Sequence, residues 1–174
     1  MNYFKLYDLP ESFQIDLAVL KKKFLLLSKK CHPDFFTLTS EVDQEEALKM
    51  SVLNNEAYKT LKNEELLTSY ILEINGITTD EKESVPQDFL FEMMDINEAL
   101  MELEFEPDAE KVNQLKEQVQ KIQEELNNEI KPVLMGYSEV TTPQEELEKV
   151  KNVYLKKKYL WRINENLNRF AAAQ

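Results

Sequence analysis

Residues 17–34 of this 174-residue chain read LAVLKKKFLLLSKKCHPD, and this stretch decides the fold of the amino-terminal part. Asp16 is a good N-cap, and Pro33 disfavours the helical conformation of His32, so the predicted helix begins near Asp16 and ends before Pro33. Its apolar side chains recur every three or four residues, the pattern of an amphipathic helix: Leu17, Leu20, Phe24, Leu27 and Cys31. On a helical wheel the opposite side carries Lys22, Lys23, Lys29 and Lys30, with Lys21 on a flank.

The same apolar spacing continues along nearly the whole chain and predicts an all-α fold. With 2 Gly and 6 Pro, the sequence has too few turn residues for many short strands. Gly76 suits a left-handed helix C-cap, and Pro132 is expected to bend or end a long helix slightly before Gly136. Further helices are expected over residues 3–9, 43–61, 64–75, 87–104, 107–136 and from 142 to about 170.

Charge is unevenly distributed along the chain, whose net charge is −12. Residues 41–148 carry 8 basic and 28 acidic side chains, whereas residues 149–174 carry 7 basic and 1 acidic. The overall negative charge argues against binding to nucleic acid or to an anionic membrane. One basic end and an acidic middle instead predict different faces for different protein partners.

The residue inventory argues against an enzyme or a metalloprotein. One Cys excludes an internal disulfide framework, and one Cys with one His excludes a Cys/His zinc site. Neither a glycine-rich phosphate loop nor a Ser/His/Asp arrangement is recognisable. The first residues lack the features of a secretory signal or transit peptide, and no apolar run is long enough for a membrane span. We therefore expect a cytoplasmic, non-enzymatic protein without cofactor, metal, nucleic-acid partner or membrane partner.

Two further stretches accompany the tripeptide His32-Pro33-Asp34: YFKLYDLP at residues 3–10 and EAYKTL at residues 56–61. The combination resembles a J-domain, the module through which co-chaperones act on DnaK-type chaperones. This resemblance covers about residues 1–75 and implies an antiparallel helical hairpin with short helices around it. Asn54 departs from the pattern because it stands where J-domains normally have a core aliphatic residue. A buried asparagine there needs hydrogen-bond partners.

Beyond Gly76 the layout resembles the HscB family of J-proteins, which serve iron–sulfur cluster assembly. The stretch DFLFEMMDINEALMELE at residues 88–104 is similar to that family's first bundle helix, and Ser69-Tyr70-Ile71-Leu72 fits the end of its J-domain. The resemblance implies a J-domain over 1–76, a linker over 77–86 and a carboxy-terminal three-helix bundle over 87–174. It also implies two protein partners, an HscA/DnaK-type ATP-dependent chaperone and the iron–sulfur scaffold protein IscU.

For the chaperone, the resemblance assigns the contact to the tripeptide and the lysines before it. Pro33 restrains the backbone where the chain leaves the helix. The Asp34 carboxylate can pair with an arginine of the chaperone through two hydrogen bonds. The lysines can attract an acidic patch on the chaperone. Such a site performs no chemistry itself but shifts the chaperone towards its hydrolysing conformation. The expected chaperone-binding residues are His32, Pro33, Asp34, Lys22, Lys23, Lys29 and Lys30.

For the scaffold, the resemblance assigns an apolar patch and a row of carboxylates on the first bundle helix. Steps of three and four residues place most of them on one helix face. The expected scaffold-binding residues are Leu90, Phe91, Met94, Asp95, Glu98 and Glu102, together with Leu155 of the last helix. The alternative is that Leu90 and Met94 belong to the bundle core and the carboxylates form an ordinary solvated face.

Two other functions remain open at this stage. One is a J-domain co-chaperone with a different client, which failure to bind IscU would select. The other is a helical adaptor in which His32-Pro33-Asp34 occurs by chance, which an unaffected partner ATPase would select.

Overall fold

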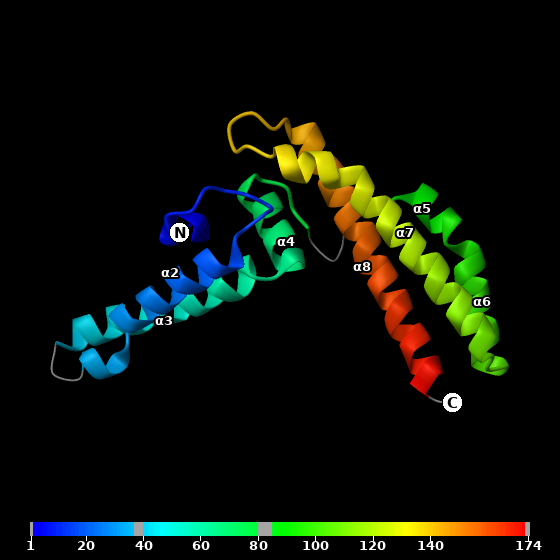
Figure 1. Cartoon of the computed structure of the whole chain (residues 1–174), viewed down its shortest axis with the longest axis horizontal. Coiled ribbons are helices and arrows are strands. Elements are labelled where there is room, and N and C mark those ends of the chain that lie inside the picture. Colours follow the sequence, from blue (N-terminus) through cyan, green and yellow to red (C-terminus); the bar gives the residue numbers. More distant parts are fainter. Residues whose placement is uncertain (1, 37–39, 80–84, 173–174) are drawn as a thin grey trace. The chain divides into compact units, whose positions relative to one another are not determined.

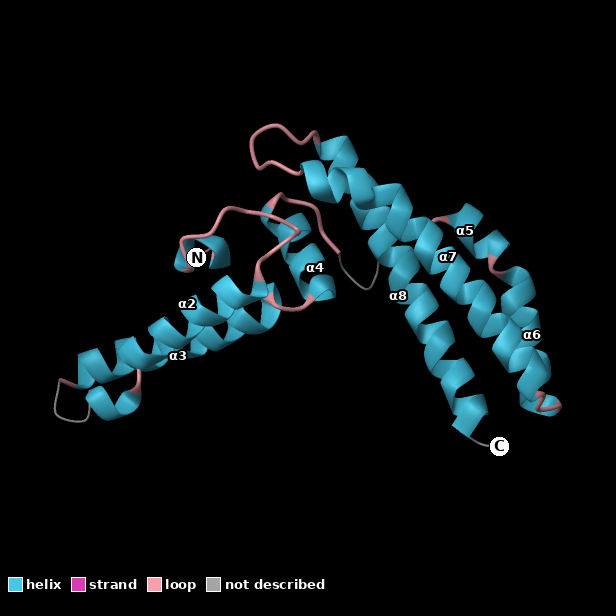
Figure 2. Cartoon of the chain, viewed as in Figure 1, coloured by secondary structure: helices cyan, strands magenta, loops and turns pink. Residues whose placement is uncertain are grey.

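The computed structural model describes residues 2–36, 40–79 and 85–172, and in these residues all regular secondary structure is helical (Figure 2). The helices fall into two compact units. The first consists of Met1–Gly76 and Tyr137–Thr141, and the second of Ile77–Gly136 and Thr142–Gln174. Of the predicted linker at 77–86, residues 80–84 lie outside the described residues, and Ile77 is buried. None of the described helices is long and apolar enough to cross a membrane.

The first unit is built on a helical hairpin. Helices α2 (Leu17–Lys30) and α3 (Glu41–Leu61) lie side by side and antiparallel (Figure 1). The rings of Phe24 and Tyr58 stack across the pair, with centroids 4.2 Å apart. The short helix α1 (Tyr3–Leu6) contacts α3, and its Tyr3 ring stacks at 4.5 Å on Tyr70 of α4 (Glu64–Ile74). The expected hairpin with accompanying short helices is thus confirmed.

The helix ends follow the capping residues. Asp16 accepts hydrogen bonds from the backbone N–H groups of Ala18 and Val19, as its place before the predicted helix requires. Gly76, with φ at +78°, follows α4 in the left-handed conformation that suits glycine. The expected start of α3 at residue 43 is wrong by two residues, because Ser40 and Asp43 form a capping box.

Asn54 of α3 is 1% exposed, and it finds hydrogen-bond partners on two other elements. The Tyr7 hydroxyl donates to Asn54 Oδ1 at 2.7 Å, and Asn54 Nδ2 donates to Ser28 Oγ at 2.9 Å and to the Phe24 carbonyl at 3.3 Å. Burial raises the pKa of Tyr7 well above its usual value, so the hydroxyl remains a donor at physiological pH. The polar side chain in the aliphatic position is therefore satisfied rather than strained.

The segment Tyr137–Thr141 belongs to the first unit although it follows the long helix of the second. The Tyr137 hydroxyl accepts a hydrogen bond from Asn75 Nδ2 at 3.0 Å, and its ring meets Phe13 edge-on at 4.9 Å. Sequence analysis had placed this segment within the bundle. Nothing in a five-residue loop between two helices reveals that it packs on residues more than sixty positions earlier.

The second unit contains α5 (Gln87–Glu92), α6 (Met94–Phe105), α7 (Ala109–Gly136) and α8 (Gln144–Ala172). Helices α7 and α8 form its long antiparallel pair (Figure 1). The apolar stripes of both helices are buried as their spacing predicts; they include Val112, Leu115, Val119, Leu126 and Ile130 of α7, and Leu147, Val150, Val153, Leu160, Ile163 and Leu167 of α8. These two stripes form the core of the unit.

Two expectations about these helices are corrected. The single helix expected over 87–104 is broken at Met93, whose side chain is 2% exposed and whose carbonyl accepts a hydrogen bond from the Asn97 side chain at 2.8 Å. Helix α7 runs through Pro132 to Gly136 instead of ending early. Pro132 and Asn128, whose carbonyl loses its helical partner, are both exposed, so water can solvate that carbonyl.

The Asn54 contacts generate a stability prediction. Replacement Asn54→Ala leaves Tyr7 and Ser28 without their buried partner, and we expect a loss of about 2 kcal/mol in the free energy of unfolding. Urea unfolding followed by circular dichroism measures this loss. The matched control is Asn55→Ala, the exposed neighbour on the same helix, which should change stability by less than about 0.5 kcal/mol. Equal effects of the two substitutions would contradict the role assigned to Asn54.

Candidate functional site

The tripeptide His32-Pro33-Asp34 forms a tight turn directly after α2. Pro33 begins the short 3-10 helix η1 (Pro33–Phe35), and the backbone N–H of Phe35 donates to the His32 carbonyl at 3.0 Å. The N–H of Asp34 donates to His32 Nδ1 at 3.3 Å, which leaves the proton of the neutral imidazole on Nε2. The side chains of His32 and Asp34 are 54% and 83% exposed. The turn thus presents a restrained imidazole and carboxylate to solvent.

The predicted lysines around this turn are not equivalent. Lys22, Lys29 and Lys30 are exposed on α2, and the last two lie in its final turn, where the helix dipole favours cations. Lys23 is half-buried, and its Nζ donates to the Asp8 carbonyl at 2.9 Å. Lys23 is therefore hydrogen-bonded to the loop after α1, whereas the side chains of Lys22, Lys29 and Lys30 are exposed at the surface.

A second exposed surface lies on α5 and α6. Leu90, Phe91 and Met94 are 38%, 62% and 50% exposed, so they are not the bundle core that the alternative interpretation required. The core positions of these helices are instead Phe89, Met93, Ile96, Leu100 and Leu103. Asp95 and Glu98 are exposed beside the apolar group, and in the described part of the chain neither has a cation within 4 Å. We call Leu90, Phe91, Met94, Asp95 and Glu98 the α5–α6 patch.

The apolar surface extends further along α6 than the sequence analysis proposed. Met101 is 65% exposed and Phe105 is 88% exposed. They continue the helix face of Met94 and Glu98 at steps of three and four residues. The sequence analysis missed both residues, although the same spacing could have found them.

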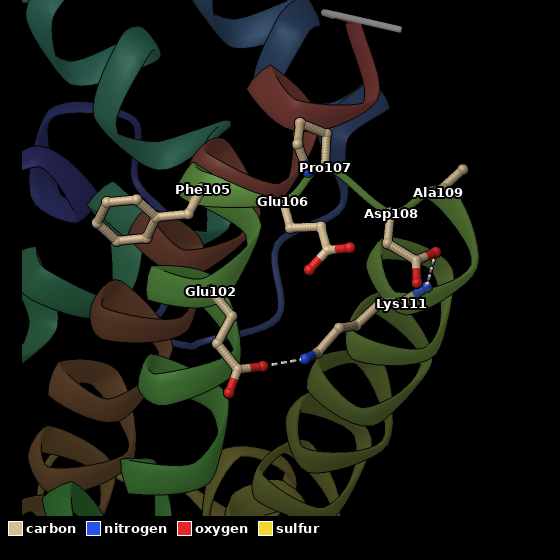
Figure 3. Close-up of a pocket in the computed structure, with 7 residues that line it drawn as sticks. All are labelled: Glu102, Phe105, Glu106, Pro107, Asp108, Ala109 and Lys111. Carbon is tan, nitrogen blue, oxygen red and sulfur yellow. Dashed lines mark hydrogen bonds and ion pairs between the residues drawn. The ribbon is translucent and has the colours of Figure 1, made fainter.

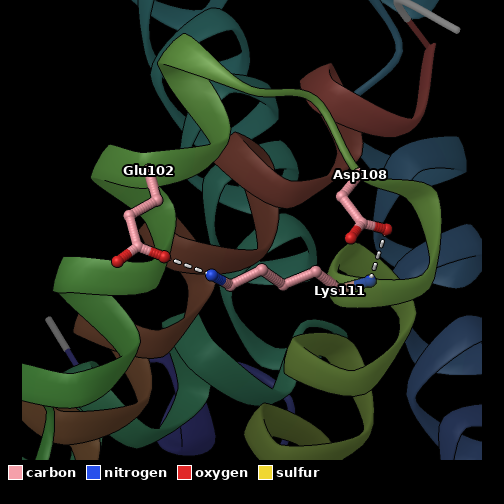
Figure 4. Close-up of polar contacts among 3 residues, drawn as sticks. All are labelled: Glu102, Asp108 and Lys111. Atoms are coloured by element: carbon pink, nitrogen blue, oxygen red, sulfur yellow. Dashed lines mark hydrogen bonds and ion pairs between the residues drawn. The ribbon is translucent and has the colours of Figure 1, made fainter.

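Glu102 stands apart from the other predicted carboxylates because it is already engaged. It forms an ion pair with Lys111 of α7 across the α6–α7 turn (Figure 4). Asp108 caps α7 in the same turn by accepting from the backbone N–H groups of Glu110 and Lys111. These residues line an open pocket (Figure 3), completed by Phe105, Glu106, Pro107 and Ala109. Glu102 therefore helps to fix this turn.

Leu155, the residue of helix α8 expected to contact the scaffold, is buried. Leu155 is only 7% exposed, so it offers little surface to a partner. Tyr159, one turn further, accepts a hydrogen bond from Asn97 Nδ2 at 2.8 Å and meets the Phe89 ring edge-on at 6.0 Å. Since Phe89 and Asn97 belong to α5 and α6, Tyr159 borders the α5–α6 patch. Its position directly after three lysines is the only sequence signal for it.

Cys31, directly before the exposed turn, has the environment of a structural thiol. It is 8% exposed, and burial raises the pKa of its thiol above the usual value, which lowers the thiolate fraction at neutral pH. Among the described residues, no group of three His, Cys, Asp or Glu side chains is placed to hold a metal ion.

Comparison with known proteins points to one family. Residues 85–168 match the family model described as the HSCB C-terminal oligomerisation domain. The human iron-sulfur cluster co-chaperone protein HscB is 31% identical over 168 residues, which cover 95% of this chain and 67% of the human one. A co-chaperone protein HscB homolog of Vibrio vulnificus (strain YJ016) is 34% identical over 139 residues, covering 74% and 81% of the two chains.

Solved structures give the same result. The crystal structure of human co-chaperone protein HscB superimposes with a TM-score of 0.74 at 29% identity, covering 97% of this chain and 81% of that one. The chaperone HscB from Vibrio cholerae gives a TM-score of 0.73 at 26% identity and covers 99% of both chains.

The exposure of the α5–α6 patch generates a stability prediction. Because Phe91 is largely in solvent, Phe91→Ala should change the free energy of unfolding by less than about 0.5 kcal/mol. Leu103→Ala, on the buried face of α6, should cost about 2–5 kcal/mol. Denaturant unfolding of both variants measures the difference. A large loss of unfolding free energy for Phe91→Ala would show that Phe91 is part of the core.

Proposed function

Since this chain belongs to the HscB family of co-chaperone proteins, we propose that it stimulates the ATPase of an HscA/DnaK-type chaperone and delivers an IscU-type iron–sulfur scaffold protein to it. In this proposal residues 1–76 act as the J-domain and residues 87–174 as the scaffold-binding bundle, with the cytoplasm as the expected compartment. ATP hydrolysis takes place on the chaperone, and this chain forms or breaks no bond itself.

The observation that carries the proposal is the restrained turn at the end of a basic helix. His32 and Asp34 are exposed there and held together through His32 Nδ1. The turn holds the Asp34 backbone in place and leaves its carboxylate exposed, and an exposed carboxylate on a restrained backbone suits bidentate pairing with an arginine of the chaperone. Lys22, Lys29 and Lys30 would accelerate encounter with an acidic surface, mainly through the association rate.

The client side of the proposal depends on the α5–α6 patch. Exposed apolar side chains bordered by charge are a common signature of protein interfaces. Phe91, the most exposed member of the apolar group, is the strongest candidate for an anchor residue. Tyr159 replaces Leu155 as the contribution of α8, because it is the α8 residue bonded to α6 at this surface.

The chaperone half of the proposal is tested by substitution of the imidazole. His32→Gln should reduce stimulation of the chaperone's steady-state ATPase by at least about fivefold, because the coupling between the two proteins depends on this turn. Lys59→Gln, which removes an exposed charge of the same unit away from the turn, should stimulate like wild type. If wild type itself leaves the ATPase unchanged, the chain is a helical adaptor and the proposal fails.

The client half is tested on the patch. Phe91→Ser combined with Met94→Ser should weaken scaffold binding by about 30-fold or more, as expected for loss of interface anchors. Calorimetric titration measures the affinity, and scaffold-free ATPase stimulation should stay unchanged. Met135→Ser, which replaces a methionine of α7 that is 64% exposed, serves as the control. Normal stimulation without any scaffold binding by wild type would identify a J-protein with a different client.

A further inference from the structure

Two cations of α8 lie beside the α5–α6 patch. Lys156 Nζ is 5.4 Å from the centroid of the Phe89 ring of α5, and Arg162 Cζ is 5.8 Å from the centroid of the Tyr159 ring. Tyr159 is in turn hydrogen-bonded to Asn97 of α6. Lys156 thus lies against the ring of α5 that faces the core, and Arg162 lies beside the residue through which α8 is hydrogen-bonded to α6.

These cations keep their charge available. Within the part of the chain that the structure describes, neither Lys156 nor Arg162 has a carboxylate within 4 Å. The carboxylates of the patch, Asp95 and Glu98, are equally without a cationic partner within 4 Å there. Aromatic rings hold the cations by cation–π attraction, which orients them without neutralising them. The surface therefore carries separate positive and negative edges.

We propose that this surface is a bipolar docking site for a protein partner, with Asp95 and Glu98 as its acidic edge, Phe91 and Met94 as its apolar centre, and Lys156 and Arg162 as its basic edge. The proposal rests on the client binding proposed above and specifies the chemistry of the client. The partner surface carries apolar side chains with basic groups on one side and a carboxylate on the other. Arg162 receives that carboxylate.

Opposite charges at the two edges determine the orientation of the partner. A client bound in the reversed orientation would bring like charges together at both edges of the surface. Such contacts are strongly unfavourable. A nucleic acid would not fit, because its phosphates would meet the acidic edge and a chain of net charge −12. Lys156 and Arg162 are thus specificity-determining residues, whereas the apolar centre supplies most of the affinity.

The test uses the full chain and the IscU-type scaffold, with affinity measured by calorimetry at about 0.02 M and about 0.15 M salt. The double variant Lys156→Glu/Arg162→Glu should lose about tenfold in affinity at low salt, and the loss should shrink at the higher salt concentration. Arg169→Glu, an exposed cation of the same helix without an aromatic contact, should bind within about twofold of wild type. Thermal unfolding by circular dichroism verifies that each variant is folded.

A second variant separates charge arrangement from net charge. Adding Asp95→Lys and Glu98→Lys to the double variant restores the wild-type net charge but reverses the two edges. We expect this quadruple variant to bind more weakly than the double variant. If the quadruple variant or the double variant binds like wild type, the bipolar site is overturned, although the apolar patch can still bind the client. If wild type does not bind the scaffold, both the proposed client and the bipolar site are wrong. The chaperone half of the proposed function is still tested separately, by ATPase stimulation.

Discussion

A buried amide must find partners for its carbonyl oxygen and its N–H groups, and this requirement fixes the first unit at Asn54. Its partners are Tyr7, which ends α1, and Ser28 and the Phe24 carbonyl of α2. Sliding α2 along α3 by one helical turn, about 5.4 Å, would separate Asn54 from Ser28 and from the Phe24 carbonyl. An aliphatic side chain at this position would tolerate other registers. The amide therefore sets the register of α2 against α3, and with it the place on the hairpin where the turn after α2 is exposed.

The second unit uses a similar arrangement at a helix break. Asn97 donates from one side-chain nitrogen to the Met93 carbonyl and to the Tyr159 hydroxyl. The first of these bonds adds to the one that the Met93 carbonyl already accepts from the Asn97 backbone N–H, and the second connects the break to α8. Phe89 and Met93 point into the core on the two sides of the break, and Phe91 and Met94 remain in solvent. A polar side chain in an otherwise apolar contact thus shapes a candidate surface in each unit.

Apolar spacing and capping residues were sufficient to predict most of the helices, but they were not sufficient to predict every residue of the two candidate sites. The stripe of α2, the cap at Asp16 and the left-handed Gly76 follow from spacing and residue type, and the structure confirms them. The break at Met93, in contrast, depends on tertiary contacts that no local pattern shows. Leu155 and Tyr159 lie one turn apart on the same face of α8, so choosing between them required the position of α6. The tripeptide at 32–34 was recognisable from the sequence alone, but the hydrogen bond from Lys23 to the Asp8 carbonyl was not.

The position of Tyr137–Thr141 has a consequence for how the chain folds as it is synthesised. The first unit draws on residues at both ends of a sixty-residue insertion, since Tyr137 contacts Asn75 and Phe13. A nascent chain that has left the ribosome only as far as Gly76 therefore lacks part of its own first domain. That domain is complete only after α5, α6 and α7 have been translated. The contacts of Tyr137 with Asn75 and Phe13 therefore form only after most of the second unit has been synthesised.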